Sequence, residues 1–237
     1  LLSAVAVTAM AASAPLAVGD AIDRPAVAAR DASGAVLLAA ALAGPRIVAV
    51  GERGLVVLSD DGGTRWRQAA VPVSVTLTAV RFVDKDHGVA VGHGGTVLFS
   101  ADGGASWERR LDGRQIAQIE RAAAQASGNA AALKAAERLQ ADGPDKPLLD
   151  VLAFDARHVL AVGAYGLALE TSDGGHSWVT WRERLDNPRE QHLYAVRRQG
   201  QRILMAGEQG LVLQSLDGGR SFVRLHLPYT GSFFTAE

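Results

Sequence analysis

Four copies of one short motif constrain the fold of this 237-residue chain more than any other feature. Each copy has a Gly-x-x-Gly turn, a short apolar run, and then an aspartate followed by two glycines. The first glycines are Gly51, Gly92, Gly163 and Gly207, and each precedes its aspartate by ten residues. Self-similarity at a fixed offset is typical of proteins built from stacked repeats.

Each copy predicts four short antiparallel strands. In the second copy, residues 77–83 and 89–91 read as strands, 92–95 as a tight glycine turn, and 96–100 as a third strand. A fourth strand begins at Trp107. Four strands recurring at this spacing describe one blade of a β-propeller.

The Asp-Gly-Gly segment, here called the aspartate box, is interpreted as structural. Its carboxylate can accept hydrogen bonds from the turn, its glycines permit unusual backbone angles, and its aromatic residue can pack between blades. Copy one has Arg65 where a hydroxyl is expected, and copy four has Phe222 in place of Trp, so both turns are expected to be looser. The predicted box residues are Asp61, Trp66, Asp102, Trp107, Asp173, Trp178, Asp217 and Phe222.

The repeats predict an all-β fold, a propeller over residues 34–237 with four-stranded antiparallel blades. The blades are expected at 34–72, 75–111, 148–185 and 191–226, and residues 229–237 are expected to start a fifth. Because closed propellers have about four to eight blades, we expect a larger propeller truncated at its C-terminus.

A helical hairpin is predicted at residues 113–143, between the second and third blades. Residues 113–125 and 129–140 are rich in Ala, Gln, Glu, Arg and Leu. Ser127-Gly128 separates them, and Asp142-Gly143-Pro144 ends the second helix.

The N-terminal residues predict export. Residues 1–18 are small and apolar, and two small-x-small patterns, at 9–11 and 12–14, fit a signal-peptide cleavage site. We therefore expect a partial signal peptide at 1–20, an N-terminal extension at 21–33, and a periplasmic protein, or a lumenal one in a photosynthetic organism. A membrane anchor fits less well, because polar residues and Pro15 interrupt a barely sufficient run.

Composition excludes several classes of site. Lys and Arg number 24 and Asp and Glu 25, so the charge gives no argument for a nucleic-acid partner. Cysteine is absent, which removes disulfides and thiolate chemistry. The six histidines show no ligand spacing, so neither a metal nor any other cofactor is expected.

The repeat pattern resembles the photosystem II stability/assembly factor family. The resemblance rests on Gly-x-x-Gly, four strand residues and Ser/Thr-x-Asp-Gly-Gly-x-Ser/Thr-Trp, and on residues 71–83 and 87–92. It covers roughly 34–235 and implies a seven-bladed lumenal or periplasmic propeller that aids assembly of a membrane complex. The Ala-rich insert resembles bacterial members linked to resistance-nodulation-division exporters, which implies an exporter as partner.

No active site can be assigned from motifs, so the chain is not expected to be an enzyme. The alternative is a periplasmic glycan-binding propeller or a sialidase-like glycoside hydrolase. Sialidases carry an aromatic-Arg-Ile-Pro segment, and the nearest match, Pro45-Arg46-Ile47-Val48, lacks its aromatic and its final proline. A third hypothesis is a fragment that closes only by oligomerising, because an open blade edge invites pairing.

The Gly-x-x-Gly turns and the blade connections are expected on one face, opposite the boxes. Fixed glycines holding variable polar tips suit a recognition surface. We expect this face to bind a protein of a membrane complex, with the chain peripheral to the membrane at most. The predicted partner-binding residues are Glu52, Arg53, His93, Tyr165, His192, Glu208, Gln209 and Tyr229.

Overall fold

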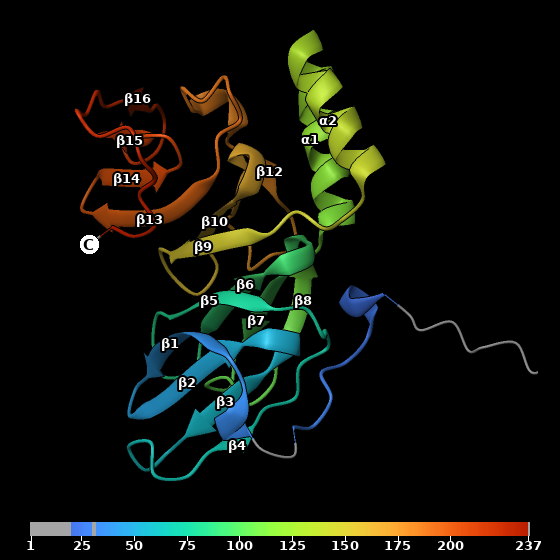
Figure 1. Cartoon of the computed structure of the whole chain (residues 1–237), viewed down its shortest axis with the longest axis vertical. Helices are drawn as coiled ribbons and strands as arrows, with labels where there is room; N and C mark the ends of the chain where they lie inside the picture. Colours follow the sequence, from blue (N-terminus) through green and yellow to red (C-terminus); the bar gives the residue numbers. More distant parts are fainter. Residues whose placement is uncertain (1–19, 30–31, 237) are drawn as a thin grey trace, which may run out of the picture.

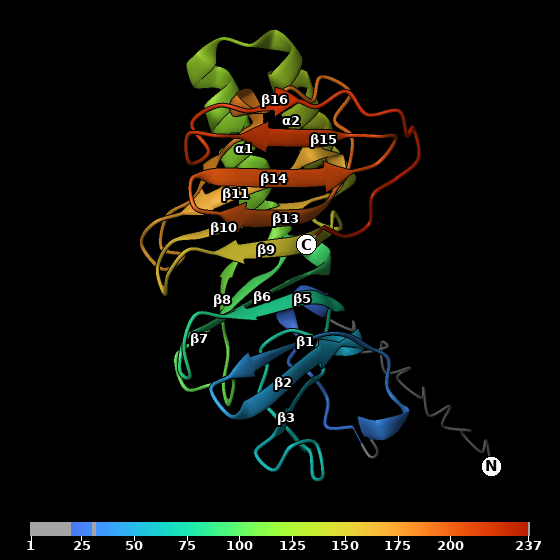
Figure 2. The ribbon, with the colours of Figure 1, turned by 90° about the vertical axis from the view of Figure 1, so that its left-hand side faces the viewer.

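The computed structural model describes residues 20–29 and 32–236, which form four sheets of four antiparallel strands each (Figures 1 and 2). In every sheet the strands are hydrogen-bonded in chain order. Blade one is β1 Leu37–Ala43, β2 Arg46–Gly51, β3 Val56–Ser59 and β4 Arg67–Gln68, and blade two is β5 Leu77–Phe82, β6 Gly88–Gly92, β7 Val97–Ser100 and β8 Glu108–Leu111. Blade three is β9 Leu148–Ala153, β10 Val159–Gly163, β11 Ala168–Thr171 and β12 Val179–Thr180, and blade four is β13 Leu193–Gln199, β14 Arg202–Gly207, β15 Val212–Ser215 and β16 Val223–Arg224.

The first strands of the four blades, β1, β5, β9 and β13, contact one another in succession. Figure 2 shows the blades following one another from blue to red, as blades do around a propeller axis. This arrangement confirms the all-β propeller predicted from the repeats.

The core lies between the blades. Val48, Val50 and Leu58 of blade one pack towards Leu77 and Trp107 of blade two, and equivalent clusters lie between the later blades. Because a blade between two others is buried on both faces, its middle strands are apolar at nearly every position rather than at alternate ones. This explains why β6 and β10 are buried along their whole length.

The box turns are held by their own side chains. In blade two, Asp102 Oδ1 accepts from Ser106 N at 2.9 Å and Oδ2 from Ser106 Oγ at 2.6 Å, while Trp107 Nε1 donates to Gly104 O at 2.9 Å.

The two unusual boxes keep part of this bonding. In blade one the Arg65 guanidinium replaces the hydroxyl, with Nε 2.8 Å from Asp61 Oδ2. In blade four, Phe222 has no indole donor, but it is buried with its ring centroid 5.8 Å from that of Trp181.

The helical hairpin is formed by α1 Gly113–Ser127 and α2 Ala130–Asp142. Asp112 and Gln115 make a capping box at the start of α1. Gly128, in the left-handed conformation, ends α1, and Asn129 caps α2. The pair projects from the sheets beside blade three (Figure 1).

The predicted opening strand of a fifth blade is not formed, since no strand lies within 229–236 of the described chain. Gly210 N donates to Gly231 O at 2.8 Å, much as Gly54 N donates to Val75 O in blade one. These residues therefore take the place of an inter-blade connection. A strand also needs a neighbouring strand for its hydrogen bonds, and within the described residues no strand pairs with this segment.

The predicted signal peptide lies outside the described residues except for Asp20. Within the described chain, no helix is long and apolar enough to cross a membrane. Residues 20–29, here called the N-terminal strap, run along blades one and two (Figure 1).

Candidate interaction surface

In each Gly-x-x-Gly turn, the third residue of the motif has a left-handed backbone conformation. Three turns, η3 Glu52–Gly54, η4 His93–Gly95 and η5 Ala164–Gly166, join the second and third strands of blades one to three, and 208–210 does so in blade four. The third residues are Arg53, Gly94, Tyr165 and Gln209, with φ of 55°, 66°, 56° and 53°. Positive φ is uncommon outside glycine, so a shared loop geometry holds three larger side chains at equivalent positions.

Two of the predicted site residues act within the fold. Glu52 Oε1 accepts from Val36 N at 3.2 Å, and Glu208 Oε1 accepts from His192 N at 2.9 Å. Both carboxylates therefore fasten their loop to the start of the blade's first strand.

Tyr165, His192 and Glu208 lie together on blades three and four. The rings of Tyr165 and His192 have centroids 5.0 Å apart, and His192 Nδ1 is 3.4 Å from Glu208 Oε1. Tyr194 extends the group, 6.2 Å from the His192 ring. Burial, and then the charge of Glu208, raise the pKa of Tyr194. We call these four residues the aromatic cluster.

Lys146, after α2, covers the same tyrosine. Its ammonium is 5.5 Å from the Tyr165 ring centroid, a cation–π contact. Burial works to lower the pKa of Lys146, but hydrogen bonding to Asp145 and the charge of Asp142 raise it, so the ammonium stays charged.

A buried ion pair joins the insert to this loop. Glu120 of α1 is 3% exposed, and its carboxylate accepts from Thr180 Oγ1 and from Arg182 Nε, both at 2.6 Å. Arg182 also bonds Glu190 Oε1 at 3.2 Å and reaches the Tyr165 carbonyl at 3.5 Å. The insert thus holds the backbone that carries Tyr165.

Sequence reasoning missed Glu120, Arg182 and Tyr194. The available signals were the spacing of Glu120, one helical turn after Ile116 on the buried face of α1, and the place of Tyr194 in a first strand.

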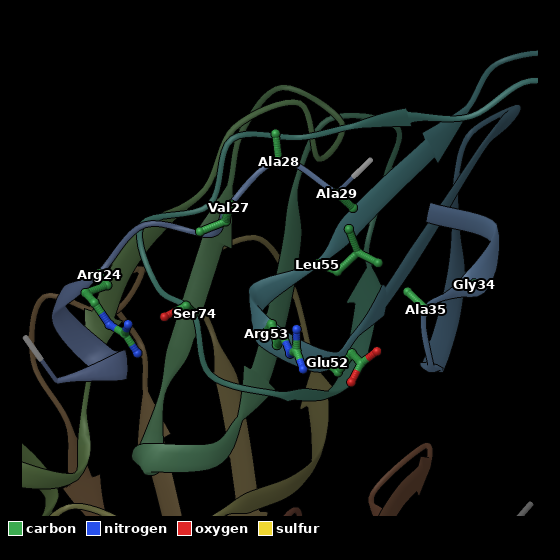
Figure 3. A pocket seen from close by; sticks show the side chains of 10 residues that line it. All are labelled: Arg24, Val27, Ala28, Ala29, Gly34, Ala35, Glu52, Arg53, Leu55 and Ser74. Atoms are coloured by element: carbon green, nitrogen blue, oxygen red, sulfur yellow. The ribbon is translucent and has the colours of Figure 1, made fainter. Parts of the chain in front are cut away.

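A hollow of about 660 Å³ lies beside the η3 loop (Figure 3). Its lining residues come from the strap, from the η3 loop, and from Gly34, Ala35, Leu55 and Ser74. Neither the Arg24 nor the Arg53 side chain bonds or pairs with another residue in the described chain. Two guanidiniums therefore line a hollow that is otherwise largely small and apolar.

The structure groups some predicted residues and separates others. Tyr165, His192 and Glu208 form one cluster, while Glu52 and Arg53 line the hollow. His93 and Gln209 are exposed on their own loops, and Tyr229 meets Phe233 edge-on, with ring centroids 5.1 Å apart. No group of three His, Asp or Glu side chains able to hold a metal occurs among the described residues.

A protein-family model and several solved structures match the chain. The family model, photosynthesis system II assembly factor YCF48, matches residues 58–129 and 129–230. A structure of YCF48 from Cyanidioschyzon merolae is 19% identical with a TM-score of 0.55, over 80% of this chain and 56% of that one. This chain therefore spans about half the length of that relative.

Two further structures show the range of similarity. An ancestral GH74 enzyme is 14% identical with a TM-score of 0.57, over 83% of this chain and 25% of that one. A structure of YCF48 bound to D1 peptide is 14% identical with a TM-score of 0.44, over 80% and 82%. No curated protein sequence matches.

Proposed function

The chain belongs to the photosynthesis system II assembly factor YCF48 family, and from this membership we propose that it is an exported, non-catalytic propeller that binds a protein subunit of a membrane complex. The aromatic cluster is the observation that carries the proposal. Tyr165 is 43% exposed although it is anchored on two sides, by His192 and by Lys146. Rigid, half-exposed tyrosines are frequent anchors of protein interfaces.

The insert supports a binding role for this face. Glu120 and Arg182 tie α1 to the Tyr165 carbonyl, so helix and loop present one rigid surface. A surface held in its bound geometry loses less conformational entropy on association.

We further propose that the membrane complex is a resistance-nodulation-division exporter in the periplasm. The support is the resemblance of the Ala-rich insert to bacterial members of the family. The predicted signal peptide is consistent with this compartment.

The alternative is a glycan-binding or glycoside-hydrolysing propeller. The GH74 similarity supports the shared fold alone, at 14% identity. Glycosidases use a pair of carboxyl groups facing a substrate groove. Glu52 and Glu208, the two carboxylates within the glycine loops themselves, are each bonded to a backbone N–H, which favours a binding role.

The proposal is tested by capture from detergent-solubilised membranes of the source organism. The bait is the whole chain, compared with Tyr165→Gly and with Gln209→Gly, the matched change at a predicted site residue that lies outside the aromatic cluster. Glycine occupies this loop position naturally in blade two, so both variants should fold.

We expect Tyr165→Gly to weaken capture of an exporter subunit by at least about tenfold, the effect of losing an interface anchor. The control should capture it normally. Equal capture by both variants would remove the aromatic cluster from the interface. Capture of no membrane protein, together with retention on a xyloglucan or sialoglycan column, would instead support the glycan alternative.

A further inference from the structure

The N-terminal strap is bound to blade two as a peptide ligand would be. Ile22 is 2% exposed and joins the core between blades one and two, although its neighbours Asp23 and Arg24 are exposed. The strap reaches this site from outside the repeat, because the first strand of blade one begins only at Leu37.

Gly94 makes the socket for Ile22. A Cβ atom at position 94 would lie 2.8 Å from Ile22 Cγ1, closer than side chains tolerate. The equivalent positions of the other three loops hold Arg53, Tyr165 and Gln209, so blade two alone leaves this space. The space that a side chain at position 94 would fill is therefore occupied by Ile22 of the strap.

Two arginines hold the carboxylate that follows Ile22. Arg114, in the first turn of α1, bonds both Asp23 oxygens, at 2.8 and 3.0 Å. Arg109 of β8 bonds Asp23 Oδ1 at 3.1 Å. Hydrogen bonding to Arg114, and then to Arg109, lowers the pKa of Asp23 to about 2, so the site takes an ionised carboxylate.

The strap's backbone is recognised as well. Ser74 donates to Ala21 O from its N–H at 2.9 Å and from its hydroxyl at 3.3 Å, and Arg109 donates to Ile22 O. Ala26 N donates to Val71 O at 3.0 Å. Main-chain bonds combined with a side-chain socket and a paired charge are the components of peptide recognition.

We propose that Gly94, Ser74, Arg109 and Arg114 form a recognition site for a partner peptide in which a β-branched apolar residue precedes a carboxylate, and that the chain's own strap occupies this site in cis. Charge complementarity and the seated strap define the occupant. Since a tethered ligand acts at millimolar effective concentration, a partner peptide binds appreciably only when the strap is released. This inference goes beyond the proposed function, because its site is separate from the aromatic cluster.

The test uses the full chain with its strap released by Ile22→Gly and Asp23→Gly. The probe is a fluorescent peptide with the sequence of residues 18–28, measured by anisotropy. We expect it to bind the released chain at least about tenfold more tightly than the unmodified chain, whose site is filled.

Two variants of the released chain locate the binding. Adding Gly94→Gln should abolish peptide binding by filling the socket. Adding Glu137→Gln, which introduces the same side chain at an exposed position of α2, should leave binding unchanged. No binding to the released chain, equal binding to the unmodified chain, or binding that survives Gly94→Gln would each overturn the proposal.

A second measurement does not depend on the released chain folding normally. In the otherwise unmodified protein, Gly94→Gln should displace the strap and speed amide hydrogen exchange in residues 20–27, most clearly at Ala26. Glutamine has natural precedent at this backbone angle in Gln209. Unchanged exchange at Ala26 would show that Gly94 is not the socket.

Discussion

At the scale of single residues, each box aspartate is held as an anion by its own turn. In blade two the carboxylate of Asp102 is held by the backbone N–H and hydroxyl of Ser106 and by the hydroxyl of Ser100. Burial works against the charge, but these bonds outweigh it and lower the pKa of Asp102. The aspartate therefore stabilises its own turn, and its carboxylate oxygens bond groups of that turn.

Asp102→Ala should lower the free energy of unfolding by about 1–2 kcal/mol, the loss of its net hydrogen bonds. Urea denaturation at pH 7 measures the change. Asp186→Ala, at an exposed carboxylate in the connection after blade three, is the control and should stay within about 0.5 kcal/mol of the parent. An equal loss in both variants would mean that Asp102 acts only as a general surface charge.

The stability of the fold should fall in acid, and the pKa values of the box aspartates predict the pH range. The pKa values of Asp61, Asp102, Asp173 and Asp217 all lie below the ordinary 3.8. A lowered pKa stabilises the fold above the unfolded value and ceases to do so as pH falls through the folded one. The melting temperature should therefore decline below about pH 5. The melting temperature of Asp102→Asn, which has no carboxyl group to titrate at this position, should decline less steeply with falling pH. Parallel curves of melting temperature against pH for the variant and the parent would contradict this account.

At the scale of secondary-structure elements, the insert is part of the blade rather than a decoration on it. Glu120 is almost fully buried where α1 packs against β12, and its partner Arg182 is mostly buried too. Breaking such a pair leaves one charge without compensation, which destabilises more than the intact pair stabilises.

Glu120→Ala should destabilise the protein by about 2–4 kcal/mol, because Glu190 is then the one acidic partner that Arg182 keeps among the described residues. Chemical denaturation followed by circular dichroism measures this. Glu137→Ala, on the exposed side of α2, is the matched control with an expected change below about 0.5 kcal/mol. If both variants unfold like the parent, the insert is only loosely attached.

Sequence reasoning succeeded where the repeat carried the information. Fixed spacing identified the blades, and the Ser127-Gly128 break separated two helices that the structure also has. It failed at residues 229–235, because apolar and aromatic residues favour a strand only where a neighbouring strand can pair with it. It also missed the roles of Glu120 and Gly94. The sequence does not show that Glu120 is buried against Arg182, or that Ile22 packs on Gly94, because both contacts join residues far apart in the chain.

At the scale of the whole molecule, one carboxylate links three blades. Asp150 of β9 accepts from Arg81 of β5 at 3.0 Å, from Arg197 of β13, and from Val196 N at 3.0 Å. Its side chain is 6% exposed, while each arginine is about one-third exposed. Blades two, three and four are therefore fixed relative to one another at their first strands.

Asp150→Ala should lower the free energy of unfolding by about 2 kcal/mol, less than for a fully buried pair because both arginines still reach water. It should also reduce the cooperativity of unfolding between blades, seen as a lower m-value in urea. Glu183→Ala, at an exposed position, provides the control. An unchanged m-value with the full loss of stability would mean that the blades still unfold together.

The shared backbone angle of the glycine loops separates recognition from folding. Arginine, glycine, tyrosine and glutamine all occupy the third loop position at nearly one value of φ. A residue exchanged there alters the chemistry of the face while the strands beneath keep their pairing. Such a position can diversify under selection for a new partner with little loss of stability, which also makes these four tips natural places to engineer binding.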